Sequence, residues 1–529
     1  MSTERDAGRA IGAVTEGLAP AAPAGAAPGQ SVVRQVAVGA AFMIAGRLVI
    51  RGLSIISMLV LARLLVPEDF GLVALAGAAI AFIEVLSVTG YGMVLVRQPD
   101  PSRELYDTAW TLNILRCLLL AGLIAATAEW QAAFLNDPRI APVLMVVALT
   151  IALDGFTSIG MYRLQREMQF DRVFRFQVVN KVAAFAASLI LAVILQNYWC
   201  LVLGNLAAKV VSVPYSYWLA PHRPRLSLRN ARGLLRFSGW MLVINAFNTA
   251  DAHGPNLILG RWVGLPALGA FQVSYHVAAV PVHEVAVPVR TPIYAGYAKV
   301  QHDMALLRRH FIGGFAFLAA IMVPLSVGIA LTAPQVERLA LGPNWAGVAP
   351  LIALCALYSL ADCLAAFTIN VFFVLDRLRP YVKTLGLLVL VRLPAVAVAA
   401  LHWGVTGVVA VMLATAVLNA LVWHWQVSRL LGHSLRAVAA EVWRSFAAAA
   451  AMALAVILLQ GWLPAGPPGF LRAMLELAML AACGASVHIG AQLLLWRLSG
   501  APAGAEQRLL SGAAQLARRL RRHSLILSS

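Results

Sequence analysis

Long apolar runs follow one another along this chain, and no other feature limits its fold as much. A helix needs about 20 apolar residues to cross the hydrocarbon core of a bilayer. A lone apolar segment in lipid must also satisfy its own backbone hydrogen bonds, so each run is predicted to be helical. The sequence therefore predicts an all-α polytopic membrane protein with about 14 transmembrane helices. The runs lie at 37–62, 70–95, 110–128, 141–160, 178–196, 199–219, 238–260, 268–289, 311–332, 349–372, 382–400, 403–425, 444–460 and 473–496.

The charge distribution sets the orientation of these spans. Only 12% of the 529 residues are charged, about half the usual roughly 25%. The net charge of +18 would suit nucleic acid if it were spread over the surface. With the N-terminus in the cytoplasm, however, 28 Lys or Arg fall in cytoplasmic segments, 5 in outer segments and 8 inside spans. This bias follows the positive-inside rule, so we expect no nucleic-acid partner and both termini in the cytoplasm.

A repeated stretch divides the chain into two parts. Residues 59–71 read LVLARLLVPEDFG, and 257–269, which lie 198 residues later, read LILGRWVGLPALG. Six predicted spans separate the copies, and an even number preserves orientation, so the parts are predicted to be parallel repeats. Arg63 is interpreted as an anchor to lipid headgroups, and Gly71 and Gly269 as sites of close packing beside an outer turn.

The repeat and the composition together predict six segments. The two lobes of six helices are followed by an added pair of spans, and the remaining segments are polar or basic. The tail sequence RRLRRH at 518–523 favours contact with anionic lipid or a role as a topology anchor. The segments are a disordered cytoplasmic tail at 1–33, an N-lobe at 34–219, a basic cytoplasmic linker at 220–237, a C-lobe at 238–427, spans 13 and 14 at 428–497, and a basic cytoplasmic tail at 498–529.

Several catalytic and cofactor motifs are absent from the sequence. There is no G-x-x-x-x-G-K-[ST] phosphate-binding loop and no DxD, and HEVAV at 283–287 lacks the second histidine of H-E-x-x-H. We therefore predict no catalytic residue, no cofactor and no metal. These absences favour a transporter driven by gradients over an enzyme or an ATP-driven pump.

Polar residues inside the spans are the candidates for a binding site, because ionisable groups at membrane depth are costly and usually face a cavity or a partner. Arg47 and Arg51 share one helical face, as expected for a phosphate clamp. The alternative is structural pairing with Glu84 or Asp154. Four residues of the seventh span occupy an arc of about 140°, which would line a water-filled cavity or form interhelical hydrogen bonds. These residues are Asn245, Asn248, Asp251 and Asn256, and Arg290 near the inner end of the eighth span completes the substrate-binding candidates.

A second set of residues would couple transport to an ion gradient. His276 and His283 share a face of the eighth span, which suits either proton coupling or packed neutral histidines. The coupling candidates are Asp154, His276, His283 and Glu284, and weaker candidates inside spans are Lys209, Arg116, Arg392, Asp362 and Asn370.

Four motifs follow one another along the first half of the chain: ARLLVPEDFG (62–71), GYGMVLVRQPD (90–100), TAWTLN (108–113) and RLQREMQF (163–170). In this order they resemble the polysaccharide transporter, or oligosaccharide flippase, family. The family shares a superfamily with the multidrug and toxic compound extrusion transporters and the lipid II flippases. The resemblance is strongest over about 38–300.

The resemblance implies a bacterial inner-membrane protein with two six-helix lobes. It would move undecaprenyl-diphosphate-linked oligosaccharide to the periplasmic leaflet by rocking between inward-open and outward-open states. It also implies cavity cations, for which Arg47 and Arg51 are the candidates. The expected partners are the lipid-linked substrate, membrane lipids, a polysaccharide polymerase and glycosyltransferases. The alternatives are a cation-coupled small-molecule extruder, which would favour acidic and aromatic cavity residues, and a membrane polymerase or ligase, which would show a long outer loop.

Overall fold

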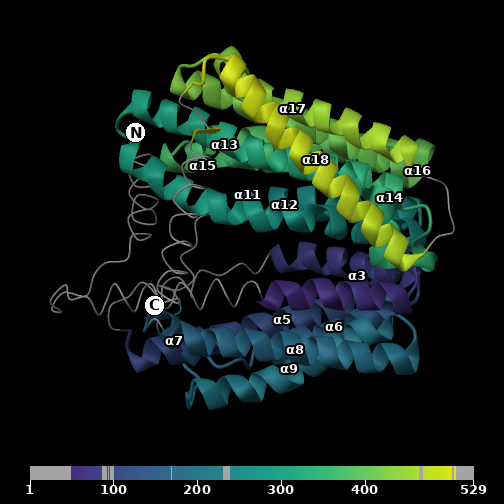
Figure 1. Ribbon diagram of the computed structural model, residues 1–529. Helices are drawn as coiled ribbons and strands as arrows, with labels where there is room; N and C mark the ends of the chain where they lie inside the picture. The colour runs from purple at the N-terminus through teal and green to yellow at the C-terminus, as the bar shows by residue number, and fades with distance from the viewer. Residues whose placement is uncertain are drawn as a thin grey trace, which may run out of the picture. The chain divides into compact units, whose positions relative to one another are not determined.

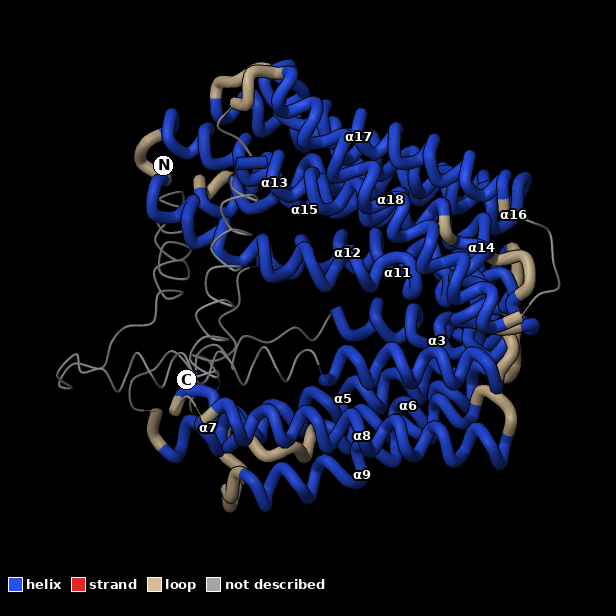
Figure 2. Tube along the Cα trace, in the orientation of Figure 1, coloured by secondary structure: helices blue, strands red, loops and turns tan. Residues whose placement is uncertain are grey.

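The computed structural model describes residues 49–85, 92, 95, 101–167, 169–229, 231, 239–463, 469–502 and 506–507, and in these ranges every regular element is a helix (Figures 1 and 2). The chain forms two compact units, Met1–Ala270 and Phe271–Ser529. The first unit contains a helix at 49–64, α3 (Pro67–Val85), α5 (Arg103–Leu135), α6 (Ile140–Asp154), α7 (Gly160–Arg166), α8 (Phe170–Leu195), α9 (Trp199–Leu219), α11 (Gly239–Trp262) and the start of α12 (Leu265–Val300). The second contains the rest of α12, α13 (Met304–Leu331), α14 (Ala333–Val336), α15 (Ala349–Val374), α16 (Leu378–Leu431), α17 (Leu435–Trp462), α18 (Phe470–Leu498) and two short turns, η2 (Glu337–Leu341) and η3 (Pro343–Trp345).

The helices confirm an all-helical membrane protein. Each predicted span overlaps a helix, and eight helices in the described part of the chain are long and apolar enough to cross a membrane. The total of fourteen crossings stays a prediction, as do the six segment boundaries. The helices often extend beyond the apolar run. α5, for example, begins where the Ser102 hydroxyl accepts a hydrogen bond from the Leu105 amide, seven residues before the predicted span. Hydropathy detects the part of a helix inside lipid, whereas a cap fixes its true end.

α16 contains two predicted spans in one run of 54 residues. A straight helix of this length would measure roughly 80 Å, far more than one crossing needs. Gly404 has φ 61° and ψ −156°, which breaks the helix. The Tyr381 and Trp423 rings lie 5.2 Å apart, and Gln426 donates to Thr384, so the chain reverses at this glycine. The predicted spans 382–400 and 403–425 are thus the two arms of a helical hairpin.

The repeated stretch forms a tight corner of the first unit. α3 begins with Pro67 at its first position, where proline costs no helical hydrogen bond. The Asp69 carboxylate accepts from the Val66 amide at 3.2 Å and from the Tyr198 amide at 2.9 Å. A Cβ at Gly71 would overlap the carbonyl oxygen of Leu265, and a Cβ at Gly269 would overlap that of Pro67. The predicted close packing at both glycines is therefore confirmed.

An ion-pair network closes the next turn of the same unit. The Arg139 guanidinium lies 2.7 Å from Glu68 and 2.8 Å from Asp137. Burial raises the pKa of the Asp137 carboxyl, but the hydrogen bonds and charge of Arg139 outweigh burial and hold this pKa below its usual range. The turn between α5 and α6 is thus tied to the start of α3.

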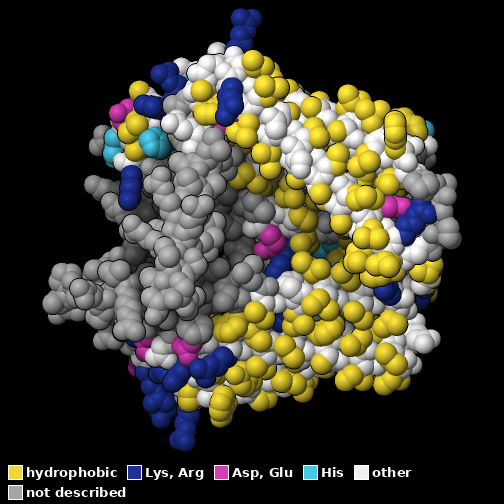
Figure 3. All heavy atoms as spheres, in the orientation of Figure 1, with side chains coloured by type: hydrophobic (Ala, Val, Ile, Leu, Met, Phe, Trp, Pro, Cys, Tyr) yellow, Lys and Arg dark blue, Asp and Glu magenta, His cyan; other side chains and the backbone are white. Residues whose placement is uncertain are grey.

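Large apolar side chains cover the outside of both units, as contact with lipid requires. Figure 3 shows hydrophobic side chains over α8 and α9 and over α16 to α18, with Lys and Arg gathered at the end of the first unit near α7. Ile194 is 69% exposed and Leu390 is 68% exposed. Four of the five cysteines are buried, and none forms a disulfide in the described residues, as expected of small apolar fillers.

Candidate functional site

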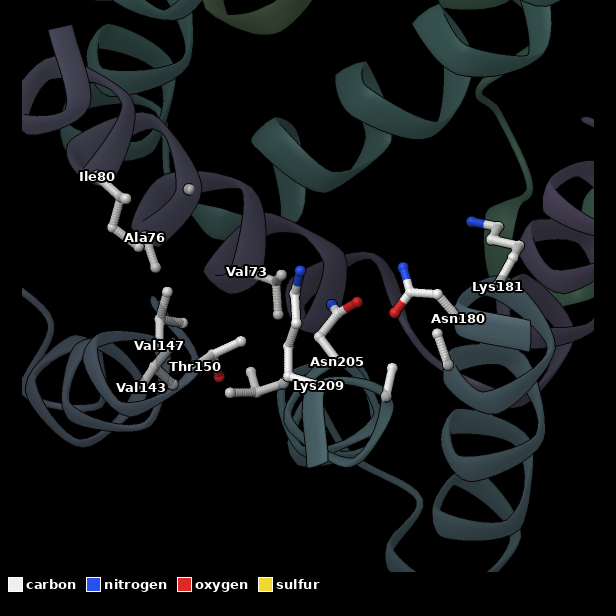
Figure 4. Close-up of a pocket in the computed structure, with 14 residues that line it drawn as sticks. Val73, Ala76, Ile80, Val143, Val147, Thr150, Asn180, Lys181, Asn205 and Lys209 are labelled. Carbon is white, nitrogen blue, oxygen red and sulfur yellow. The ribbon is translucent and has the colours of Figure 1, made fainter. Parts of the chain in front are cut away.

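A cavity of about 410 Å³ lies inside the first unit between α3, α6, α8 and α9. Its two walls differ in chemistry. α3 and α6 supply mostly apolar side chains, whereas α8 and α9 supply amides and ammonium groups. Figure 4 shows the amide groups of Asn180 and Asn205 turned toward each other, with Lys209 beside Asn205. The polar lining residues are Thr150, Asn180, Lys181, Asn205 and Lys209.

The ammonium of Lys209 forms an ion pair with the Asp154 carboxylate at the end of α6. Asp154 therefore pairs with a lysine of α9, whereas the sequence alone offers Arg47 or Arg51 as its alternative partner. The Lys209 side chain is 29% exposed and that of Asp154 is 46% exposed, so neither charged side chain is buried. Asp154, a candidate for ion coupling, thus lies next to Lys209, which the sequence indicates only as a weaker candidate.

A second electrostatic group lies beside this pair. Glu84 of α3 interacts with the charges of Arg116 on α5 and Asp154 on α6. The Arg116 guanidinium also donates to the Asn113 side chain at 3.3 Å. Together with the Asp154–Lys209 pair, the first unit holds carboxylates and cations from four helices within its membrane-spanning core, and such groups are costly unless they interact.

The predicted phosphate clamp falls partly within the described residues. Arg47 lies outside them, and Arg51 is half-buried on the helix at 49–64. The charge of Arg51 acts on Lys181 of α8, which lines the cavity. Arg51 is therefore close enough to Lys181 for the two charges to interact, and the paired clamp stays a prediction.

The predicted amide stripe is present on α11, in the first unit. Asn248 is exposed, Asn245 and Asp251 are half-buried, and Asn256 is buried with 6% exposure. Exposure thus falls from Asn248 through Asp251 to Asn256, toward the end of α11 that leads into the repeated corner. The predicted water-filled cavity along the stripe stays a prediction.

The remaining candidates lie on α12, in the second unit. The ring of His276 is exposed and its Nδ1 lies 3.2 Å from the Gln272 carbonyl oxygen, while Glu284 is half-buried. For His283 and Arg290 the structure describes only the helical backbone. Because α12 continues to Val300, Arg290 lies inside the helix, and its position near the inner end of the predicted span stays a prediction. The helix thus extends 11 residues beyond the predicted span, which ends at 289.

Sequence reasoning undervalued a buried arginine of the second unit. Arg392 is 1% exposed on α16, and its guanidinium donates to the Tyr358 hydroxyl at 2.6 Å. The guanidinium carbon also lies 5.2 Å from the centre of that ring, within the range of a cation–π contact. Tyr275 of α12 lies against the same tyrosine, with ring centres 5.9 Å apart. In the sequence Arg392 is a lone arginine inside an apolar run. Such a pattern does not indicate which residue the arginine contacts.

Comparison with solved structures identifies the fold. The lipid II flippase MurJ, in an inward closed conformation, superimposes with a TM-score of 0.65 at 12% identity, covering 86% of this chain and 98% of that one. An inward-facing multidrug resistance MATE family transporter of the MOP superfamily gives a TM-score of 0.57 at 16% identity, covering 72% and 95%. These likenesses and the long apolar helices define the class of protein as a multi-pass, all-helical membrane protein with the fold that these two proteins share.

Sequence comparison identifies the family within that class. The model of a family described as polysaccharide biosynthesis protein matches residues 60–350. The chain belongs to this polysaccharide biosynthesis family. It is 22% identical over 417 residues to the lipopolysaccharide biosynthesis protein WzxC of Escherichia coli K12, covering 77% of this chain and 84% of that protein. It is 24% identical over 308 residues to the succinoglycan biosynthesis transport protein ExoT of Rhizobium meliloti, covering 58% and 62%.

Proposed function

We propose that this protein moves undecaprenyl-diphosphate-linked oligosaccharide or polysaccharide units across the bacterial inner membrane by alternating access. The family, the transport relatives and the MOP fold support a transporter of polysaccharide biosynthesis. The observation that carries the proposed substrate is the cavity of the first unit, whose polar wall bears two ammonium groups and two amides at membrane depth.

The chemistry of that wall suits a ligand with a phosphate end and a sugar end. Lys181 and Lys209 offer positive charge, and Arg51 adds a guanidinium close to Lys181. Guanidinium groups bind phosphate in a bidentate fashion, and amides bind sugar hydroxyls by donating and accepting hydrogen bonds. In this proposal Arg47 and Arg51 hold the diphosphate during transport. The sugar is held by Asn245, Asn248, Asp251 and Asn256, with Arg290 as a further contact on α12.

Coupling to an ion gradient is assigned to Asp154, His276, His283 and Glu284. Of these, Asp154 has the clearest environment, since its charge is balanced by Lys209 on a neighbouring helix. A change in the protonation of Asp154 would release the lysine toward the cavity. This proposal carries no cofactor, no metal and no covalent step.

The second candidate function is a cation-coupled multidrug extruder of the same superfamily. An extruder of organic cations would favour carboxylates in its cavity, whereas the charged residues that line this one are both lysines. A membrane polymerase or ligase is less well supported, because ExoT is named as a transport protein. The proposed location is the inner membrane, with both termini in the cytoplasm and with polysaccharide polymerase and glycosyltransferases as partners.

Reconstituted translocation tests this function. Proteoliposomes would be loaded with a fluorescent undecaprenyl-diphosphate-linked oligosaccharide, and its arrival in the opposite leaflet followed by quenching. Lys181→Gln should slow translocation at least about tenfold, because a hydrogen bond to a charged group is worth about 1.5–3 kcal/mol. Lys383→Gln removes an exposed lysine of α16 and is the matched control. Transport of cationic dyes without transport of the lipid-linked sugar would reject the proposal in favour of the extruder.

A further inference from the structure

The chain folds back on itself after the last membrane helix. α18 ends at Leu498, and Gly500 and Ala501 both adopt positive φ, 84° and 50°. The Ala501 amide donates to the Trp496 carbonyl oxygen at 2.9 Å. The indole of Trp496 donates in turn to the Pro502 carbonyl oxygen at 3.0 Å. The chain therefore turns sharply at the end of α18 and is held against the helix by two hydrogen bonds.

This return places Glu506 in a buried polar site between α17 and α18. The Glu506 side chain is 3% exposed and lies 2.8 Å from Nε of Arg444, whose side chain is 5% exposed. A second guanidinium nitrogen lies 3.4 Å from the other carboxylate oxygen, so the pair is bidentate. Gln492 of α18 donates to the same carboxylate at 2.9 Å and to the Ser445 hydroxyl at 3.3 Å.

The cost of burying a charge makes the site at Arg444 selective for a carboxylate. An unpaired charge in an apolar surrounding is costly, and a bidentate arginine with a further amide donor is the arrangement that offsets the cost. Arg444 is the ninth residue after the start of α17 at Leu435, and Gln492 lies six residues before the end of α18. The carboxylate is thus received about 9–13 Å inside the helix ends, given 1.5 Å of rise per residue.

The sequence of the tail singles out the same residue. Glu506 is the sole carboxylate side chain between 498 and 529, and five arginines follow it: Arg508, Arg518, Arg519, Arg521 and Arg522. The acidic side chain of this basic tail is buried against Arg444. Glu506 is therefore the residue through which the tail can dock at an arginine.

We propose that α17 and α18 carry a carboxylate-binding site, formed by Arg444 and Gln492, whose ligand is the chain's own Glu506. The site docks the start of the C-terminal tail onto the last helix pair. Because five arginines follow Glu506, docking fixes the place on the molecule at which a strongly basic, headgroup-binding segment begins. This role is independent of the transported substrate.

Limited proteolysis of the full chain tests the docking. Trypsin cleaves after Arg508, two residues beyond Glu506, and cleavage there requires the segment to leave the site. The protein would be placed in phosphatidylcholine nanodiscs, so that no anionic lipid shields the tail. Glu506→Gln should speed cleavage after Arg508 at least about tenfold, since the variant removes the buried carboxylate that pairs with Arg444. Glu441→Gln is the matched control, because Glu441 also contacts Arg444, at 3.6 Å, but is 37% exposed; it should change the rate less than about twofold.

Two results would overturn the proposal. One is a Glu506→Gln protein that is folded and is cleaved at the wild-type rate. The other serves if that variant does not fold. Arg444→Lys keeps the positive charge but cannot pair with the Glu506 carboxylate in a bidentate fashion. Cleavage after Arg508 should therefore again be faster than in the wild type, by at least about threefold. Cleavage of a folded Arg444→Lys protein at the wild-type rate would show that Arg444 does not hold Glu506.

Discussion

At the scale of single residues, the charges of the first unit act as pairs across helices. Asp154 on α6 and Lys209 on α9 form one such pair beside the cavity. The sequence could name both residues as costly in lipid, but it could not join them, because 55 positions separate them and helix packing decides which faces meet. It could not indicate a cavity between four helices either, since helical periodicity does not specify neighbours.

The Asp154–Lys209 pair makes a testable contribution to stability. Asp154→Asn leaves an ammonium at membrane depth without its carboxylate and should lower the free energy of unfolding by about 1–2 kcal/mol, between the values for exposed and buried pairs. Lys209→Met alone should cost a similar amount. The double variant should lose less than the sum, because neither charge remains. Denaturant unfolding in micelles measures all four proteins, and purely additive losses would show that the pair contributes nothing.

At the scale of elements, the repeated stretch explains a contact between helices that lie far apart in the sequence. Gly71 and Gly269 are equivalent residues of the two copies, and so are Pro67 and Leu265, whose carbonyl oxygens the glycines approach. The contact is therefore reciprocal, as in a two-fold interface. Here the sequence predicted both the corner and its close packing. It also predicted the helices themselves and the division of α16 into two spans, 382–400 and 403–425, but it missed the polar ends of several helices.

Alanine substitutions at the corner should be severe. Gly71→Ala and Gly269→Ala each place a methyl group onto a carbonyl oxygen of the facing helix, so each should cost about 2 kcal/mol or more in the free energy of unfolding. Gly122→Ala is the control, because nothing lies within 4 Å of a Cβ at that position on α5. There alanine should be neutral or slightly stabilising, since it is the better helix former. Equal unfolding midpoints for the control and the two corner variants would contradict the close approach.

At the scale of the whole molecule, charge and hydropathy predict which ends of the helices face the cytoplasm. Contacts within the protein do not specify this orientation. The hairpin of α16 offers a test, because one predicted span, 382–400, separates Arg377 from Trp403. Both positions are exposed. In intact cells expressing a protein without its five native cysteines, Trp403→Cys should react with a membrane-impermeant maleimide. Arg377→Cys should react only after permeabilisation, because the positive-inside rule places it in the cytoplasm. Labelling of both positions in intact cells would mean that 382–400 does not cross the membrane. The reverse pattern would invert the proposed topology, and the lipid-linked sugar would then have to move through the protein in the opposite direction.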